Sequence, residues 1–386
     1  MDKKNKNPNV PNLRFPIFHF DWNENYFGNI CTIRSGIGFK ADEYVEQGVP
    51  LLKIDNVGYG NIKWNNISYL PETYLKQYPF LKLNENDIVL ALNRPITNNQ
   101  LKISKLTSKD IPSILYQRVG KINVSSDYNL DYIYYLLTKN VFDFVLKTSI
   151  GSDQPFISTE NLKKLIMKVP TITEQQKIGH FLSLIDQRIQ TQIKIINDYK
   201  ILKNHIIKSF IKQNGTSYLL LEIAELGRGR VINSAEISKQ KNPIYPVYSS
   251  QTSNNGIMGY LDNYDYEGEY ITWTTDGANA GTVYYRNGKF NCTNVCGILK
   301  IKNGYDAYYI SNILNCYTKK YVSTNLANPK LMNNVMANIK INLPSIEQQK
   351  HSSKILQSIE YRVEIEEDIK LNLVKQKAFL LKNMFI

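Results

Sequence analysis

The sequence predicts an α+β fold: two strand-rich globular domains, related by pseudo-twofold symmetry and separated by two long helices that form an antiparallel coiled coil. Three observations lead to this class: an internal repeat, two long segments with helical periodicity, and short β-branched or aromatic runs between them. The chain has 386 residues, of which 42% are hydrophobic, so it is long enough and apolar enough for two cores.

The internal repeat is clearest in its second half. Ile185 and Asp186 recur as Ile359 and Glu360, a shift of 174 residues, whereas the Glu-Gln-Gln-Lys stretch at 174–177 recurs at 347–350, a shift of 173. Weaker matches lie upstream, where Gln154-Pro155 falls opposite Asn328-Pro329 and Asp131 opposite Asp306. A duplicated chain is therefore expected, with well-preserved helix starts and divergent domain bodies.

Each Glu-Gln-Gln-Lys stretch begins a long segment with helical spacing. Between Glu174 and Lys212 there is no Pro and only one Gly, which allows a helix about 58 Å long at 1.5 Å per residue. Apolar residues follow a seven-residue ladder, and its polar breaks at Gln192 and Lys203 recur at Glu366 and Lys377. This period and length favour a coiled coil over helices that pack only on their own domains.

The expected organisation has five segments, and the bodies contain short strands and helices. The strands are predicted at 89–92, 113–116, 270–273 and 282–285, the helices at 130–146 and 307–322, and a hairpin turn at Asn287-Gly288. The segments are a disordered lead (1–15), a first domain (16–172), a first long helix (173–213), a second domain (214–345) and a second long helix (346–386).

Composition favours a polyanionic partner. The net charge is +13 and there are 27 tyrosines; a basic surplus is typical of nucleic-acid binding, although an AT-rich genome also enriches Lys, Asn, Ile and Tyr. There is no membrane-length apolar run and no signal-peptide pattern. The four cysteines, Cys31, Cys292, Cys296 and Cys316, lack the paired spacing of a metal site and are expected to be reduced thiols of a cytoplasmic protein.

The doubled Pro-to-Glu-Gln-Gln-Lys helix start resembles the conserved regions of type I restriction-modification specificity subunits. Gly151-x-x-Gln154 ahead of Pro170 is similar to the end of such a subunit's first target-recognition domain. The second copy departs from the pattern, with Asn325-x-x-Asn328 in place of Gly-x-x-Gln and Ser352 in place of Gly179. The resemblance implies a DNA-binding adaptor that recognises an asymmetric, two-part target.

The resemblance also implies the partners. Two methyltransferase subunits would dock on the helices, and two ATP-driven restriction and translocation subunits would complete the complex, so S-adenosylmethionine, ATP and Mg²⁺ are expected on the partners and no cofactor on this chain. The helix-start residues are the partner-binding candidates: Glu174, Gln175, Gln176, Glu347, Gln348 and Gln349.

Motifs for catalysis are missing from the sequence. It contains no adenine-methylation loop, no phosphate-binding GxxxxGK[ST] and no HExxH or GxSxG, and Gly36-Ile-Gly38 is only a fragment of a Gly-rich loop. We therefore expect a non-catalytic subunit. A stand-alone nuclease or modification enzyme with dispersed catalytic residues, and a structural coiled-coil scaffold, remain the alternatives.

Base reading needs polar side chains on exposed loops, and phosphate contacts need cations. Lys40, Lys239 and Lys241 are expected to face phosphates. The other DNA-contact candidates are Asn93, Arg94, Tyr116, Gln117, Arg118, Ser152 and Gln154 in the first domain, and Ser250, Gln251, Asn254, Thr274, Thr275 and Asn279 in the second.

Overall fold

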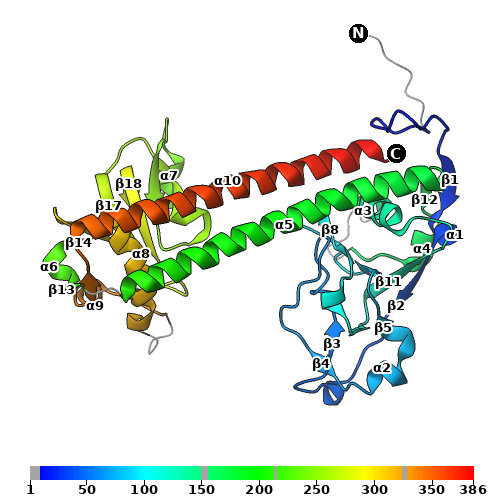
Figure 1. The fold of residues 1–386 in the computed structure, drawn as a ribbon, viewed down its shortest axis with the longest axis horizontal. Helices are drawn as coiled ribbons and strands as arrows, with labels where there is room; N and C mark the ends of the chain where they lie inside the picture. The colour runs from blue at the N-terminus through cyan, green and yellow to red at the C-terminus, as the bar shows by residue number, and fades with distance from the viewer. Residues whose placement is uncertain (1–8, 149–154, 213–214, 324–327) are drawn as a thin grey trace, which may run out of the picture. The chain divides into compact units, whose positions relative to one another are not determined.

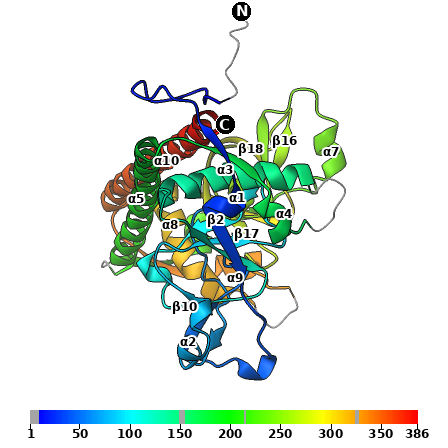
Figure 2. The ribbon, with the colours of Figure 1, turned by 90° about the vertical axis from the view of Figure 1, so that its right-hand side faces the viewer.

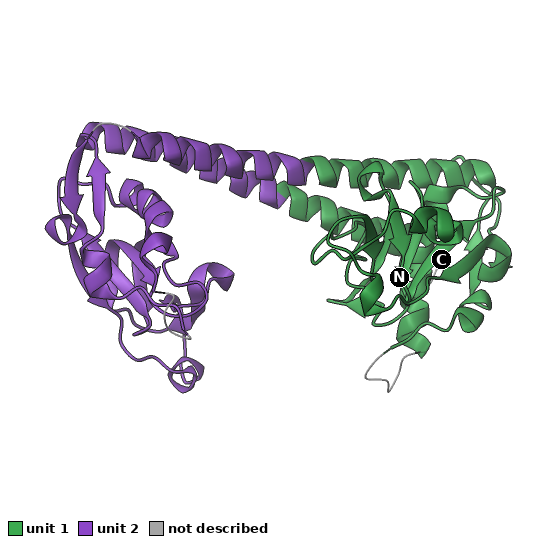
Figure 3. Cartoon of the chain, turned by 90° about the horizontal axis from the view of Figure 1, so that it is seen from below, with its two compact units in different colours: residues 1–191, 369–386 green, residues 192–368 purple. Residues whose placement is uncertain are grey.

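The chain forms two compact units in the computed structural model, which describes residues 9–148, 155–212, 215–323 and 328–386. Unit 1 comprises residues 1–191 and 369–386, and unit 2 comprises residues 192–368 (Figure 3). Each unit thus holds one strand-rich domain together with parts of two long helices, α5 (Ile172–Ile211) and α10 (Ile346–Met384). The predicted α+β class is confirmed.

Unit 1 is built on two four-stranded sheets. One is antiparallel with the order β2-β11-β6-β9, and the other has the order β4-β3-β10-β5, in which β3 and β10 are parallel. Figure 2 shows α3 at one end of this unit and the region of β10 and α2 at the other. The elements are β1 (Asn23–Tyr26), α1 (Phe27–Ile30), β2 (Cys31–Ser35), β3 (Val49–Leu52), β4 (Tyr69–Leu70), α2 (Tyr74–Gln77), β5 (Lys82–Leu83), β6 (Ile88–Ala91), β7 (Ile96–Thr97), β8 (Gln100–Leu101), β9 (Ile103–Lys105), β10 (Ser113–Leu115), β11 (Val119–Val124), α3 (Leu130–Thr148), α4 (Thr159–Lys163) and β12 (Ile166–Val169).

Unit 2 is built on one six-stranded sheet with the order β14-β19-β17-β18-β15-β16, against which α8 packs (Figure 1). A parallel pair occurs here too, between β15 and β18. The elements are β13 (Thr216–Leu219), α6 (Leu220–Ile223), β14 (Ala224–Arg228), α7 (Ser234–Ser238), β15 (Tyr245–Tyr248), β16 (Ile257–Leu261), β17 (Tyr266–Thr274), β18 (Val283–Cys292), β19 (Cys296–Ile301), α8 (Ala307–Tyr317), α9 (Asn333–Ala337) and β20 (Lys340–Leu343).

The long helices run antiparallel. In unit 1 the first turns of α5 share a core with the last turns of α10, since Ile178 and Leu182 belong to the same buried cluster as Leu380 and Met384. In unit 2 the end of α5 shares a core with the start of α10, through Phe210 and Leu356. These contacts confirm the predicted antiparallel pairing of the two ladders.

The polar breaks in the ladders all make polar contacts with the opposite long helix. Lys377 contacts Asp186 at 2.6 Å in unit 1, and Lys203 forms the corresponding ion pair with Glu360 in unit 2. Gln192 Nε2 donates to the carboxylate of Glu366, and both of these side chains are buried. Polar residues inside a helix seam specify one register, so the repeat of 174 residues is also visible in the contacts.

Two sequence expectations about local structure are wrong. Residues 9–15, expected in a disordered lead, pack on the long helices: Leu13 N donates to Asn383 O at 2.8 Å, and the Arg14 guanidinium donates twice to Glu174. Asn287-Gly288 is not a turn but lies inside β18, where Gly288 faces Gly268 across the ladder. The β17–β18 connection falls at 275–282 instead, and β18 continues through the expected turn to Cys292.

The predicted helices are confirmed with shifted ends. The first spans 130–148, and the second ends at Tyr317 rather than at 322. The structural counterpart of Asp306 is Asn129 and not Asp131, because each accepts a hydrogen bond from the backbone N–H three residues later and so caps its helix. In the part of the chain that the structure describes, no helix is long and apolar enough to cross a membrane.

Candidate nucleic-acid interface and helix starts

Four separate segments of unit 1 meet at one edge of its sheets. Gln117 N donates to Ile37 O at 3.0 Å, and Leu92 N donates to Arg118 O at 2.9 Å. Arg94 N in turn donates to Pro155 O at 2.9 Å. The loop after β6, the turn before β11, the segment after β2 and the segment that begins at Pro155 are thereby fixed beside one another. They contain most of the predicted contact residues of this domain.

The side chains at this edge are mostly free to contact a ligand. Lys40, Arg94, Gln117 and Arg118 are exposed, and Tyr116 is partly exposed. Within the described residues, none of the three cationic side chains in this group takes part in an ion pair. Arg94 and Arg118 both have left-handed backbones, with φ of 45° and 65°. Non-glycine residues in this conformation are uncommon and cluster at functional sites.

The remaining predicted residues of unit 1 are less exposed or not described. Asn93 is only partly exposed, and its Oδ1 is buried without a partner among the described residues. Ser152 and Gln154 lie outside the described residues, so their contact with DNA stays a prediction.

Unit 2 repeats the same backbone frame. Gly277 N donates to Pro329 O at 3.0 Å and Thr275 N to Val295 O at 3.3 Å, as Arg94 N and Leu92 N donate in unit 1. The frame makes Gly277 and Val295 the counterparts of Arg94 and Arg118. The two cations of the first edge are therefore replaced by uncharged residues at the second, so the two edges present different chemistry.

Two of the residues predicted to contact DNA in unit 2 point inward, which corrects the prediction. Thr274 and Thr275 are 1% and 0% exposed. The Thr275 hydroxyl lies within hydrogen-bond distance of Val295 O and of the Asp276 carboxylate, so it holds the β17 end to the neighbouring turn. Their positions directly after a strand suggested loop residues, but β17 runs through Thr274.

The other predicted residues of unit 2 gather around the loop between β15 and β16. Asn254 is exposed, and Asn279 Nδ2 donates to Thr252 Oγ1 at 3.1 Å, which brings the β17–β18 connection to this loop. Ser250 and Gln251 are partly exposed, but the Gln251 amide donates to Ile257 O inside the loop itself. Lys239 and Lys241 are exposed at the end of α7 and just after it.

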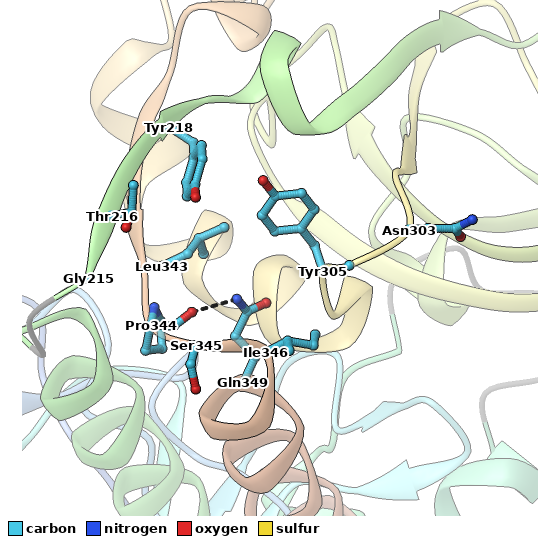
Figure 4. Close-up of a pocket in the computed structure, with 11 residues that line it drawn as sticks. Gly215, Thr216, Tyr218, Asn303, Tyr305, Leu343, Pro344, Ser345, Ile346 and Gln349 are labelled. Carbon is cyan, nitrogen blue, oxygen red and sulfur yellow. Dashed lines mark hydrogen bonds between the residues drawn. The ribbon is translucent and has the colours of Figure 1, made fainter.

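The helix starts contain a matched pair of buried glutamines. Gln175 Oε1 accepts from Asn129 N at 3.0 Å, and its Nε2 donates to Pro170 O at 2.9 Å. Gln349 makes the same two bonds, from Asp306 N at 3.1 Å and to Pro344 O at 2.8 Å, and Figure 4 draws the second of them. Each glutamine thus ties the first turn of its long helix to the capped start of the domain helix.

This match corrects the alignment of the two copies. Gln175 and Gln349 are 174 residues apart, so the one-residue slip in the Glu-Gln-Gln-Lys stretch is not structural. The counterpart of Gly179 is consequently Ser353 and not Ser352. A Cβ at Gly179 would lie 2.6 Å from Asn129 Oδ1, whereas Ser353 Oγ donates to Asp306 Oδ1 at 2.8 Å.

Half of the predicted partner-binding residues are internal, which corrects their assignment to a docking surface. Glu174, Gln175 and Gln349 are 1–2% exposed, and Glu174 is held by Arg14 at 2.7 Å. The neighbouring carboxylate raises the pKa of Arg14 further. Gln176, Glu347 and Gln348 are exposed and remain candidates.

Beside the second helix start lies an open hollow of about 620 Å³. Figure 4 shows the Tyr218 and Tyr305 side chains on its wall, with Gln349 beneath them. Among the described residues, no group of three His, Cys, Asp or Glu side chains could hold a metal ion. Cys31, Cys292 and Cys296 are buried, and burial raises the pKa of the Cys31 thiol to about 12.

Comparison with known proteins identifies a family whose model matches most of this chain. The model of the type I restriction modification DNA specificity domain matches residues 21–198 and again residues 216–376. The chain is 43% identical over 176 residues to the type I restriction enzyme MjaVIII specificity subunit of Methanocaldococcus jannaschii, covering 45% of this chain and 41% of that protein. It is 36% identical over 196 residues to the putative type I specificity subunit S.MpnORF201P of Mycoplasma pneumoniae, covering 50% of this chain and 81% of that protein.

Solved structures share the fold. The crystal structure of the type I restriction-modification S subunit from M. genitalium superposes with a TM-score of 0.60 at 16% identity, covering 98% of this chain and 99% of that one. A chain solved in a study of complex assembly and conformational transition of the type I R-M system gives 0.55 at 12% identity, covering 94% and 97%. The chain spans less than half the length of the MjaVIII subunit that it matches.

Proposed function

We propose, since this chain belongs to the family of type I restriction-modification DNA specificity subunits, that it binds duplex DNA at an asymmetric, two-part target and contributes no catalytic residue itself. Each strand-rich domain would recognise one part of the target. The chemistry of methylation and cleavage would belong to partner subunits.

The repeated backbone frame with unlike side chains is the observation that carries this proposal. Both domains fix three segments side by side through the same main-chain hydrogen bonds, for example Arg94 N to Pro155 O and Gly277 N to Pro329 O. One frame offers exposed Arg94 and Arg118, whereas the other offers Gly277 and Val295. Base edges are read by side chains, so a common frame with different side chains supports recognition of two different half-sites.

The exposed residues at the helix starts support a partner surface. Gln176, Glu347 and Gln348 are exposed on first turns whose neighbouring residues are locked to the domains. We propose that two methyltransferase subunits dock there, with S-adenosylmethionine bound to them, and that two ATP- and Mg²⁺-dependent restriction subunits join the complex. The buried residues of the same motif would set the angle of each helix start.

The test is to map adenine methylation in cells that express this chain with its methyltransferase subunit, and in cells that lack this chain. A split, asymmetric methylated motif that disappears with this chain is the expected result. Incubation of the purified chain alone with plasmid, Mg²⁺, ATP and S-adenosylmethionine separates the enzyme alternative, which requires cleavage or methyl transfer without partners. A scaffold role instead predicts that this chain has no sequence preference and adds no salt-sensitive DNA binding of its own, whereas phosphate contacts make binding fall steeply with salt.

A further inference from the structure

Arg286 is a buried cation with an unusual set of neighbours. Its side chain lies on β18 and is 8% exposed. The guanidinium stacks on Tyr248 at 3.6 Å and on Tyr284 at 4.4 Å from the ring centres. Within the described residues it makes no ion pair, and burial lowers its pKa. A buried charge without a carboxylate partner is costly unless its hydrogen bonds are well made.

The hydrogen bonds of Arg286 lead to one loop. Nη2 donates to Asn255 O at 2.7 Å, and Nε donates to Thr272 Oγ1 on the adjacent strand at 3.2 Å. Asn254, Asn255 and Gly256 are three consecutive left-handed residues, with φ of 49°, 52° and 82°. Such a backbone persists only where its surroundings hold it, and Arg286 is the side chain that holds it from the sheet.

Unit 1 has a matching arrangement in its own loop. The loop after β3 corresponds to the loop after β15, because Tyr116 N donates to Leu52 O as Thr293 N donates to Tyr248 O. In this loop Lys102 Nζ donates to Ile54 O at 2.6 Å. Lys102 is partly buried, makes no ion pair among the described residues, and burial lowers its pKa. Each domain thus ties the loop after its parallel strand with one desolvated cation.

We infer that Arg286 and Lys102 are positioning residues for DNA specificity, each fixing the backbone of one recognition loop while contacting no base itself. This inference rests on the proposed function. Both loops begin beside the candidate DNA edge. The last residues of the preceding strands, Leu52 in β3 and Tyr248 in β15, accept backbone hydrogen bonds from Tyr116 and Thr293, which lie in the turns at that edge. The loop of unit 2 also contains Gln251 and Asn254. Preorganised loops discriminate between sequences better because the ordering is complete before binding.

The test uses the chain in complex with its methyltransferase subunit, and the methylated motif is read from a plasmid library. Arg286→Lys keeps the positive charge but removes the planar guanidinium that stacks on the two tyrosines and donates two hydrogen bonds. It is expected to lower discrimination at one or two positions of one half-site by about tenfold, the size of one base pair's contribution. Lys102→Met is expected to do the same in the other half-site only. Lys302→Ala is the matched control, because Lys302 also donates to a backbone carbonyl, that of Glu222, but is exposed and away from the loop.

The two half-sites serve as internal controls for one another. If a folded Arg286→Lys complex shows the unchanged motif, or loses discrimination equally in both halves, the inference is overturned. Thermal unfolding checks the fold. If Arg286→Lys does not fold, Thr272→Val removes the hydrogen-bond acceptor of Nε and keeps the arginine itself, and an unchanged motif overturns the inference there. If the wild-type complex methylates no motif at all, the proposed function fails instead.

Discussion

Replacing Arg94 with Ala should weaken recognition of one half-site and leave the other intact. The side chain is exposed and makes no ion pair within the described residues, while its backbone N–H holds the loop to Pro155. Alanine keeps that N–H, so the loop should stay in place and the free energy of unfolding should change by less than about 0.5 kcal/mol. Removal of a bidentate arginine contact to a guanine should reduce the discrimination between the correct and a wrong base by about 1–3 kcal/mol, which is roughly a 5- to 150-fold change in relative affinity.

The assay measures the affinity of the methyltransferase complex for duplexes that carry changes in either half-site, at several salt concentrations. Arg188→Ala is the matched control, because Arg188 is exposed on α5 within the same unit. The expected signature is a relaxed preference at one position of one half-site with an unchanged salt slope. Equal weakening on all duplexes, with a slope smaller by about 1, would show that Arg94 contacts a phosphate. No change at all would refute the placement of the interface at this edge.

The other predictions concern the helix starts, the helix seam and the thiols. Gln175→Ala should lower the free energy of unfolding by about 1–3 kcal/mol, because it leaves the buried carbonyl of Pro170 without its donor and the N–H of Asn129 without its acceptor. Gln176→Ala should change it by less than about 0.5 kcal/mol, and chemical denaturation compares the two. Gln192→Leu alone should destabilise the protein more than Gln192→Leu combined with Glu366→Leu, because the single substitution leaves the buried carboxylate of Glu366 without this partner. A double-mutant cycle in thermal melts measures the difference, and additive effects of the two substitutions would contradict the prediction. Alkylation of the native protein should label Cys316, which alone of the four cysteines is exposed. Mass spectrometry identifies the labelled thiols, and a second labelled cysteine in the folded protein would contradict the burial of the other three.

The architecture could be predicted from sequence because it depends on periodicity, which is a one-dimensional property. The seven-residue ladder and its polar breaks gave the two helices, and Lys203 and Lys377 then paired with acidic residues at matching places. The repeat is also detectable from residue identity alone. Its register at the helix start is not, because residue identity aligns Gln349 with Gln176, whereas its hydrogen bonds match those of Gln175.

The site was harder to predict because exposure and partners are three-dimensional. Thr274 and Thr275 have the side chains of contact residues, but the length of β17 turns them into the interior. Glu174 belongs to a polar motif, yet a guanidinium from the start of the chain covers it. Arg286 gave no signal in sequence, since its importance comes from two tyrosines and a carbonyl brought together by the sheet and the neighbouring loop.

The frame shared by the two domains explains how their recognition edges can differ without loss of the fold. The segment after the first strand of each sheet passes so close to the neighbouring turn that a Cβ at Gly36 would lie 2.4 Å from Tyr116 O, and one at Gly229 would lie 2.0 Å from Cys292 O. Only glycine tolerates this approach. The frame is therefore made of backbone bonds and glycine, and side chains at the edge take little part in it. A substitution that tolerates the left-handed backbone at this edge, such as Arg118→Asn, leaves those bonds in place, so a change in the bases recognised need not destabilise the domain.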